Sequence, residues 1–474
     1  MAWRRYLVYA LIIAVSVGLG LFIFSLEQPE SRTAGRDPNR AYIPAATPSK
    51  PWASSPETQK EADAGFSVDL KDSSAKPLAG QKVGADWSQF NGSNRDNLST
   101  ETGLLKKWPT SGPKLLWIAK GTGEGYSTVA VKEGVLYTLG NKGSSETIMA
   151  LDVGTGKKLW CTPYAAATHP SVGNGPRGTP AVDENSAYGL GANGDLVAVD
   201  RKTGKIRWQK NILTEFQGNN IGWGISESVL LDGDRLICTP GGVKGTVVTL
   251  NKETGKTIWA GITPEKDPAG YASALVTQAG GVRQYIQFTA YGVIGLAAED
   301  GKFLWRDDHA SNTSANCSSP LVSGDVVFYA SSYGTGGALV RLKNDGPKVT
   351  ATLAYQTKDM KSHHGDMVIH DGLIFGSNED VFTCLELQTG KSRWKNRSVG
   401  KGAVTYADGC IYLRAENGTV ALIEATGAGY RELGKFDQPN RGPQSAWAHP
   451  VVAAKRLFLR DQDVLLCYDL AAAQ

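Results

Sequence analysis

Two short stretches of the chain place residues that could bind a ligand or carry out acid–base chemistry close together. The stretch "SHHGD" contains His363, His364 and Asp366, and the stretch "AWAHP" contains Trp447 and His449. Imidazole and carboxylate groups are common metal ligands, and histidine changes its protonation near neutral pH. These stretches therefore indicate a metal or ligand site. Their spacing matches no established metal motif, and the alternative is that these side chains hydrogen-bond to loop backbone in a polar channel.

Four other residues have side chains that suit the same kind of site: Trp223, Glu227, Tyr271 and Asn316. Carboxylate and amide oxygens bind Ca²⁺, a carboxylate can remove a proton from a substrate, and an aromatic ring can stack on a planar ligand. The nine candidates are spread from residue 223 to residue 449. They can form one site only in a fold that brings distant parts of the chain together.

A repeated pattern indicates such a fold. The sequence "ALDVGTGKKLW" ends at Trp160, and "AVDRKTGKIRW" ends at Trp208. Less complete copies extend the series, and the steps between the terminal aromatic residues range from 39 to 51 residues. The terminal residues are Trp117, Trp160, Trp208, Trp259, Trp305, Tyr355, Trp394 and Phe436. A period in this range is typical of repeat architectures.

Each repeat reads as a four-stranded antiparallel sheet. In the first copy, "YSTVAV", "EGVLYTLG", "TIMALD" and "KKLW" are short apolar or alternating runs separated by turns that contain glycine. The glycine of each Thr-Gly pair can supply the positive φ of a tight turn, and the preceding acidic residue can accept hydrogen bonds from turn amides. Eight such units predict an all-β, eight-bladed β-propeller over residues 86–474.

The two ends of the repeat region predict how the ring closes. After Phe436 the chain has three predicted strands without a fourth, while "GPKLLW" ends at Trp117 without upstream partners. Pairing this N-terminal strand with the C-terminal blade removes an unpaired edge. The tryptophans of the series (Trp117, Trp160, Trp208, Trp259, Trp305 and Trp394) are then predicted to dock each blade on the next.

In such a ring the segments that open each repeat meet at the mouth of the central channel, which would bring the nine candidates together. The same positions in other repeats hold Tyr126, Ser127, Arg177, Thr179, Ser273, Cys317 and Thr405.

The repeated pattern Ala-x-Asp-x-x-Thr-Gly-x-x-x-Trp resembles the tryptophan-docking motif of the quinoprotein-type, or PQQ-like, β-propeller family. This family includes pyrroloquinoline quinone (PQQ) dehydrogenases and the non-enzymatic outer-membrane assembly factor BamB. Residues 150–160 and 198–208 match the pattern fully, and "DWSQFNGSNRDN" resembles the first segment of exported PQQ-like repeat proteins. The resemblance implies the fold; a shared fold does not fix a function.

Three functions are consistent with the resemblance. The favoured hypothesis is a non-catalytic, BamB-like scaffold that binds envelope or exported proteins, with no cofactor firmly implied. The second is an alcohol dehydrogenase that uses PQQ with Ca²⁺, and the third is a sensor of a small molecule. None of the nine candidates lies on a dehydrogenase motif, so no catalytic residue is assigned and the identity of any metal stays unknown. The 50 basic and 46 acidic residues are interspersed, which disfavours nucleic acid as a partner.

The N-terminus predicts attachment to the cytoplasmic membrane. Residues 6–26 carry no charge and are long enough to span a bilayer, and Arg4 and Arg5 precede them. The positive-inside rule then keeps residues 1–5 in the cytoplasm and exports the remainder. A cleaved signal peptide is the alternative. No cysteine precedes Cys161, so lipid attachment at an N-terminal cysteine is not expected.

Residues 27–85 are rich in Pro, Ser, Ala, Lys and Glu, which predicts a disordered linker. Four of the six cysteines, Cys238, Cys384, Cys410 and Cys467, fall at positions where other repeats carry small or apolar side chains, and they are expected to be free, buried thiols.

Overall fold

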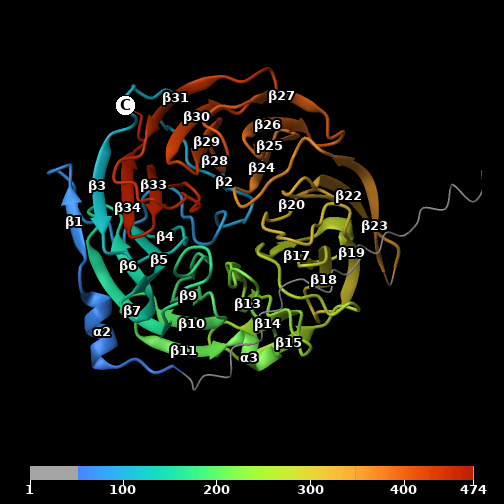
Figure 1. Cartoon of the computed structure of the whole chain (residues 1–474), viewed down its shortest axis with the longest axis horizontal. Coiled ribbons are helices and arrows are strands. Elements are labelled where there is room, and N and C mark those ends of the chain that lie inside the picture. Colours follow the sequence, from blue (N-terminus) through green and yellow to red (C-terminus); the bar gives the residue numbers. More distant parts are fainter. Residues whose placement is uncertain (1–51, 347, 473–474) are drawn as a thin grey trace, which may run out of the picture. The chain divides into compact units, whose positions relative to one another are not determined.

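The computed structural model describes residues 52–346 and 348–472, which form a ring of eight β-sheets (Figure 1). Every sheet has four antiparallel strands, and two sheets gain a fifth strand from the N-terminal part of the described chain. The predicted all-β, eight-bladed propeller is therefore confirmed. The predicted membrane segment at 6–26 lies outside the described residues. Within the described residues, no helix is both long and apolar enough to span a membrane.

Blades 1 to 4 follow one another along the chain, each ending in a strand at the rim (Figure 1). Blade 1 consists of β4 (Ala130–Lys132), β5 (Val135–Lys142), β6 (Ser145–Asp152) and β7 (Lys158–Ala166). Blade 2 consists of β8 (Ala181–Val182), β9 (Ser186–Leu190), β10 (Asp195–Asp200) and β11 (Ile206–Asn211), followed by the short helix α3 (Ile212–Phe216). Blade 3 consists of β12 (Leu230–Asp232), β13 (Arg235–Cys238), β14 (Val247–Asn251) and β15 (Thr257–Gly261). Blade 4 consists of β16 (Leu275–Thr277), β17 (Gln284–Phe288), β18 (Val293–Ala297) and β19 (Phe303–Asp307), with the 3₁₀ turn η1 (Ala279–Gly281) after β16.

Blades 5 to 8 complete the ring. Blade 5 consists of β20 (Leu321–Ser323), β21 (Val326–Ser331), β22 (Gly336–Asn344) and β23 (Val349–Thr357). Blade 6 consists of β24 (Met367–His370), β25 (Leu373–Asn378), β26 (Val381–Glu386) and β27 (Ser392–Asn396). Blade 7 consists of β28 (Gly402–Ala407), β29 (Cys410–Ala415), β30 (Thr419–Glu424) and β31 (Glu432–Asp437), with β2 (Leu98–Ser99) parallel to β28. Blade 8 consists of β32 (Val451–Ala453), β33 (Arg456–Asp461), β34 (Val464–Asp469) and β3 (Leu115–Lys120), with β1 (Ser67–Leu70) outside β3.

The ring closes through β3, as the sequence predicted. This strand pairs antiparallel with β34, and Trp117 lies opposite Cys467. The last blade thus combines three C-terminal strands with one strand from before the first repeat. Eight hydrophobic clusters hold the ring together, and each combines residues from two neighbouring blades.

The repeated motif joins each blade to the next through its tryptophan and its glycine. The Trp117 indole Nε1 donates to the Val153 carbonyl oxygen at 3.0 Å, and a Cβ on Gly156 would lie 2.7 Å from the Trp117 ring. Gly156 also has a φ of +69°, so the turn needs glycine both for its conformation and for the close approach of the indole. The indoles of Trp160, Trp208, Trp259 and Trp394 likewise donate to carbonyl oxygens of the following blade. The tryptophan of the preceding blade therefore packs against the Thr-Gly turn.

Trp305 departs from this pattern. Its indole donates to Gln284 Oε1 of its own blade at 2.6 Å. The following blade has no Thr-Gly turn at the equivalent place, because β22 continues to Asn344. Trp305 is still buried between blades 4 and 5 and contributes to their shared hydrophobic cluster.

Residues 52–81 form a strap along the outside of the ring, which corrects the prediction of a disordered linker over 27–85. Helix α2 (Pro56–Asp63) begins with a capping box between Ser55 and Thr58, and β1 pairs antiparallel with β3. The Asp152 carboxylate accepts hydrogen bonds from the Leu78 and Ala79 amides, both at 2.7 Å. The polar composition was misleading, because much of this segment is held by backbone and capping hydrogen bonds. Residues 27–51 lie outside the described part.

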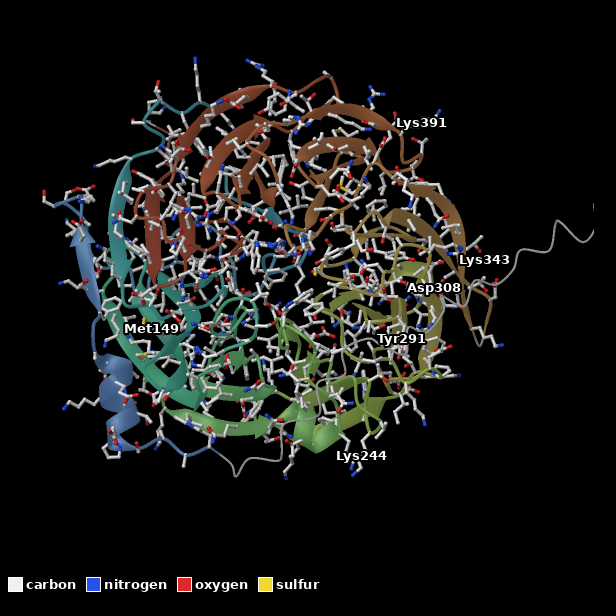
Figure 2. The ribbon with its side chains drawn as sticks, viewed as in Figure 1. Met149, Lys244, Tyr291, Asp308, Lys343 and Lys391 are labelled. Carbon is white, nitrogen blue, oxygen red and sulfur yellow. The ribbon has the colours of Figure 1, made fainter. Side chains whose placement is uncertain are left out.

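Side chains divide between the inside of the blades and the rim. Figure 2 shows Met149 within blade 1, where it is fully buried, and Lys343 and Lys391 at the rim. All six cysteines are free, and all except Cys317 are buried, which confirms the expectation for Cys238, Cys384, Cys410 and Cys467.

Candidate functional site

A cavity of about 280 Å³ lies at the channel, where the segments that open the repeats meet. Its walls come from seven of the eight blades, which explains how residues from Tyr126 to His449 share one space. The lining residues are Phe90, Tyr126, Thr128, Val172, Arg177, Thr179, Trp223, Ser226, Ser228, Tyr271, Ser273, Cys317, Tyr333, His363, His364, Asp366, Trp447 and His449.

Seven of the nine residues predicted from the sequence line this cavity: Trp223, Tyr271, His363, His364, Asp366, Trp447 and His449. Glu227 and Asn316 do not. Glu227 is 2% exposed and accepts hydrogen bonds from the Thr239 amide at 2.6 Å and the Thr239 hydroxyl at 2.8 Å. Asn316 donates to the carbonyl oxygens of Thr289 and Ala290 and accepts from the Asn312 amide. Both side chains are used to hold neighbouring loops together.

A segment before the first blade crosses the channel and contributes Phe90 to the cavity wall. This plug, residues 86–101, lies near the centre of the ring in Figure 1 and ends in β2. Arg95 donates to the Ser228 and Val229 carbonyl oxygens, both at 2.9 Å, while Asn97 Nδ2 donates to the Val404 carbonyl oxygen at 2.6 Å. The plug therefore joins blade 3 to blade 7 across the ring.

The plug also places two side chains at the cavity. Phe90 lies on the wall with its ring 5.0 Å from the His449 ring. Asn91 Nδ2 donates to Asp366 Oδ2 at 2.6 Å, and the Ser319 amide donates to Asp366 Oδ1 at 2.6 Å. Both oxygens of the Asp366 carboxylate are thus bound by the protein, and burial raises its pKa.

Aromatic rings form most of the side walls. Tyr126 and Trp447 lie 4.7 Å apart, and Trp223 and Tyr271 lie 5.5 Å apart, measured between ring centroids. The Arg177 guanidinium is 5.6 Å from the Tyr126 ring centroid, and it donates to backbone carbonyl oxygens of its own loop, including that of Val172 at 2.7 Å. The guanidinium therefore orders the loop over the cavity and stacks on one wall.

Two of the histidines of the site, His363 and His364, lie in surroundings that disfavour the protonated ring. Burial, together with the nearby Lys401 ammonium, lowers the pKa of His363 to about 4, and burial lowers the pKa of His364 well below its usual value. Lys401 Nζ lies 2.8 Å from His363 Nδ1 and 3.1 Å from Glu416 Oε1. The His449 Nε2 contacts the His364 carbonyl oxygen at 2.8 Å, and because that oxygen can only accept, Nε2 carries the proton.

Among the candidate residues, Glu227, Asn316 and Asp366 have side chains suited to binding Ca²⁺ or acting as a base, and each is bound by the protein's own hydrogen bonds. Within residues 52–346 and 348–472, no group of three or more His, Cys, Asp or Glu residues is arranged to hold a metal ion.

Sequence reasoning missed Phe90, Val172 and Tyr333 on the cavity wall. Phe90 lies in "DWSQFNGSNRDN", which was noted only as resembling a first segment. Val172 and Tyr333 lie on loop tips and are 43% and 49% exposed, and no repeat pattern marks those positions.

A second candidate surface lies at the rim of blade 3. Ile258, Ala260 and Ile262 are exposed and alternate with buried residues along β15 and just beyond it. Ile258 and Ile262 are 43% and 47% exposed, and Val243 on the neighbouring turn is 55% exposed. On three other rim strands the corresponding exposed positions are polar: Arg207 and Gln209 on β11, Arg393 and Lys395 on β27, and Lys435 and Asp437 on β31. Leu159 on β7, which precedes Trp160 as Ile258 precedes Trp259, is also apolar and is 46% exposed.

Comparison with known proteins places two kinds of protein beside this chain. A family model described as outer membrane protein assembly factor BamB matches residues 73–226 and 221–396. BamB of Shewanella oneidensis is 25% identical over 41% of this chain and 47% of its own length. The quinoprotein alcohol dehydrogenase PedH of Pseudomonas putida is 30% identical over 28% of this chain and 22% of its own length. The chain thus spans less than half the length of these curated relatives.

Solved structures share the fold. The crystal structure of BamB from Moraxella catarrhalis has a TM-score of 0.54 at 16% identity and covers 73% of this chain and 95% of its own. Quinohemoprotein alcohol dehydrogenase from Comamonas testosteroni has a TM-score of 0.60 at 12% identity and covers 82% of this chain and 81% of its own. At these identities the similarity establishes the propeller and leaves the function open.

Proposed function

Because the chain belongs to the family described as outer membrane protein assembly factor BamB, we propose that it is a non-catalytic scaffold that binds extended segments of envelope or exported proteins. The name of this family refers to the assembly of outer-membrane proteins. We further propose that residues 6–26 anchor the chain in the cytoplasmic membrane, with residues 1–5 in the cytoplasm and the propeller exported. Residues 27–51 then connect the anchor to the strap.

The observation that carries this proposal is the rim of blade 3. β15 is the outermost strand of its sheet, and an outermost strand presents backbone groups that can pair with another chain. The exposed stripe of Ile258, Ala260 and Ile262 gives such a pairing an apolar face. A partner strand would gain backbone hydrogen bonds from the edge and specificity from alternate side chains.

The protein already uses this mode of binding within itself. β1 is separated in sequence from the repeats and adds antiparallel to β3 at the rim of blade 8, with Leu70 opposite Trp117. The rim of a blade is therefore a surface to which an extended segment can bind. We assign the same role to the β15 rim, with the partner's strand in place of β1.

Replacing Ile258 and Ile262 together by Lys is expected to abolish partner binding without unfolding the propeller. Both side chains are exposed, so little packing is lost, while two charges would be desolvated in any bound complex. The measurement compares the exported proteins that co-purify with the membrane-anchored wild type and with the variant, together with their melting temperatures.

Thr352→Lys is the matched control, because Thr352 is exposed on the rim strand β23 of blade 5. Equal partner recovery from both variants would contradict the proposal.

The alternative of a quinoprotein dehydrogenase draws on the aromatic cavity and on the relatives of that class. The dehydrogenase function would be preferred to the scaffold function if the exported region bound PQQ in the presence of Ca²⁺ and then reduced a dye with an alcohol as the electron donor.

A further inference from the structure

The cavity presents hydrogen-bond donors along one side. The Thr128 amide donates to the Thr179 hydroxyl at 3.3 Å, the Thr179 amide to the Ser228 hydroxyl at 2.8 Å, and the Ser228 amide to the Ser273 hydroxyl at 2.9 Å. Thr179, Ser228 and Ser273 all line the cavity, and each hydroxyl oxygen already accepts from the preceding blade. A hydroxyl can accept and donate at the same time, so each keeps its proton for a ligand.

The cavity wall also carries a buried ring nitrogen without a partner. His449 is 6% exposed, and its Nδ1 has no hydrogen-bond partner in the described part of the chain. This ring nitrogen is therefore free to hydrogen-bond a ligand in the cavity. Asn91 Oδ1 is also buried without a partner among the described residues. Leaving a buried polar atom without a hydrogen bond costs about 1–3 kcal/mol of folding free energy. An unpaired buried atom at the cavity therefore indicates that a ligand supplies its partner.

The charge and walls of the cavity narrow the class of ligand. Arg177 and Asp366 are opposite in charge, and both are bound by the protein. The aromatic pairs Tyr126–Trp447 and Trp223–Tyr271 offer apolar faces, and the Trp447 indole N–H is a further buried donor without a partner among the described residues. A ligand that matches both sets must be uncharged, must donate and accept with the same groups, and must have apolar C–H faces.

From these features we propose that the cavity binds a neutral polyhydroxylated ligand of the saccharide class, with one ring between the aromatic walls. Its hydroxyls accept from Thr179, Ser228 and Ser273 and form a hydrogen bond with His449 Nδ1. The volume of about 280 Å³ is at the small end of the range for ligand pockets, which suits one sugar ring with its substituents. The cavity and the β15 rim are separate surfaces, so failure of binding at one does not bear on the other.

The test uses saturation-transfer NMR and calorimetry with the whole exported region and a panel of neutral mono- and disaccharides. Sodium benzoate and tetramethylammonium serve as a charged flat probe and a charged cation probe. At least one saccharide is expected to bind with saturation transferred to its ring C–H protons. The variants His449→Phe and Trp223→Ala are expected to weaken that binding about tenfold or more, which corresponds to about 1.4 kcal/mol.

His169→Ala is the matched control, because His169 is exposed and is not on the cavity wall. It is expected to bind the saccharide as the wild type does. His449→Phe keeps a ring of similar size. Its melting temperature shows whether weaker binding comes from the loss of the ring nitrogens or from unfolding of the protein. The proposal is overturned if no saccharide of the panel binds, if benzoate or tetramethylammonium binds in preference, or if the folded variants bind the saccharide as well as the wild type.

Discussion

Replacing Trp117 by Ala is expected to lower the free energy of unfolding by about 3–5 kcal/mol, the usual cost of removing a large buried aromatic side chain. Trp117 is fully buried in the strand that closes the ring, and it packs against Gly156 of blade 1. The substitution would leave a cavity and an unpaired Val153 carbonyl oxygen, so the seam between the last and first blades would be weakened. Chemical denaturation followed by circular dichroism measures this loss.

Trp208→Ala should be destabilising by a smaller amount, because Trp208 makes the same indole-to-carbonyl contact but is only partly buried. His169→Ala, at an exposed position, should leave stability nearly unchanged. If Trp117→Ala unfolded at the same denaturant concentration as the wild type, the tryptophans would not be the residues that fasten the blades.

Replacing Asp152 by Ala is expected to lower the free energy of unfolding by about 3 kcal/mol or more, since hydrogen bonds to a charged group each contribute about 1.5–3 kcal/mol. One oxygen of this buried carboxylate holds its own turn through the Thr155 amide and hydroxyl. The other accepts from the Leu78 and Ala79 amides of the strap. The variant should therefore also expose the strap to proteolysis.

Asp200 is the matched residue of the next repeat. It holds the same kind of turn through Thr203, but its second oxygen pairs with the partly exposed Arg207 at 2.7 Å. Asp200→Ala should cost about 1 kcal/mol, because the turn is lost without the strap and a partly exposed ion pair contributes little. Similar losses for the two variants, with an unchanged rate of cleavage within residues 52–81, would show that the strap does not depend on Asp152.

The fold could be predicted because one contact between neighbouring blades recurs along the chain. Packing of a tryptophan against a Thr-Gly turn requires particular residues at both positions. The repeat period and the ring closure at Trp117 could therefore be recognised from the sequence. Trp305 shows the limit of this reasoning. The motif named its position correctly, but its indole partner depends on the turn of blade 5, which does not repeat the pattern.

The candidate site could be predicted only where a residue opens a repeat. Seven of the nine residues line the cavity for that reason. The side chains of Glu227 and Asn316 instead form hydrogen bonds with Thr239 and Asn312, and the repeat pattern does not predict these contacts. The plug and the strap were missed because each occurs once, so no repeat marked them. Their positions are set by contacts distant in sequence, such as Arg95 with Val229 and Leu78 with Asp152.

The most direct measurement of the central claim is photo-crosslinking from the rim of blade 3 in intact cells. A photoreactive amino acid is placed at position 258 on β15 or, for comparison, at position 352 on β23, in the full chain. The scaffold account predicts a discrete adduct with an exported protein at position 258 and none at position 352. No adduct at 258, or the same adducts at both positions, would contradict it.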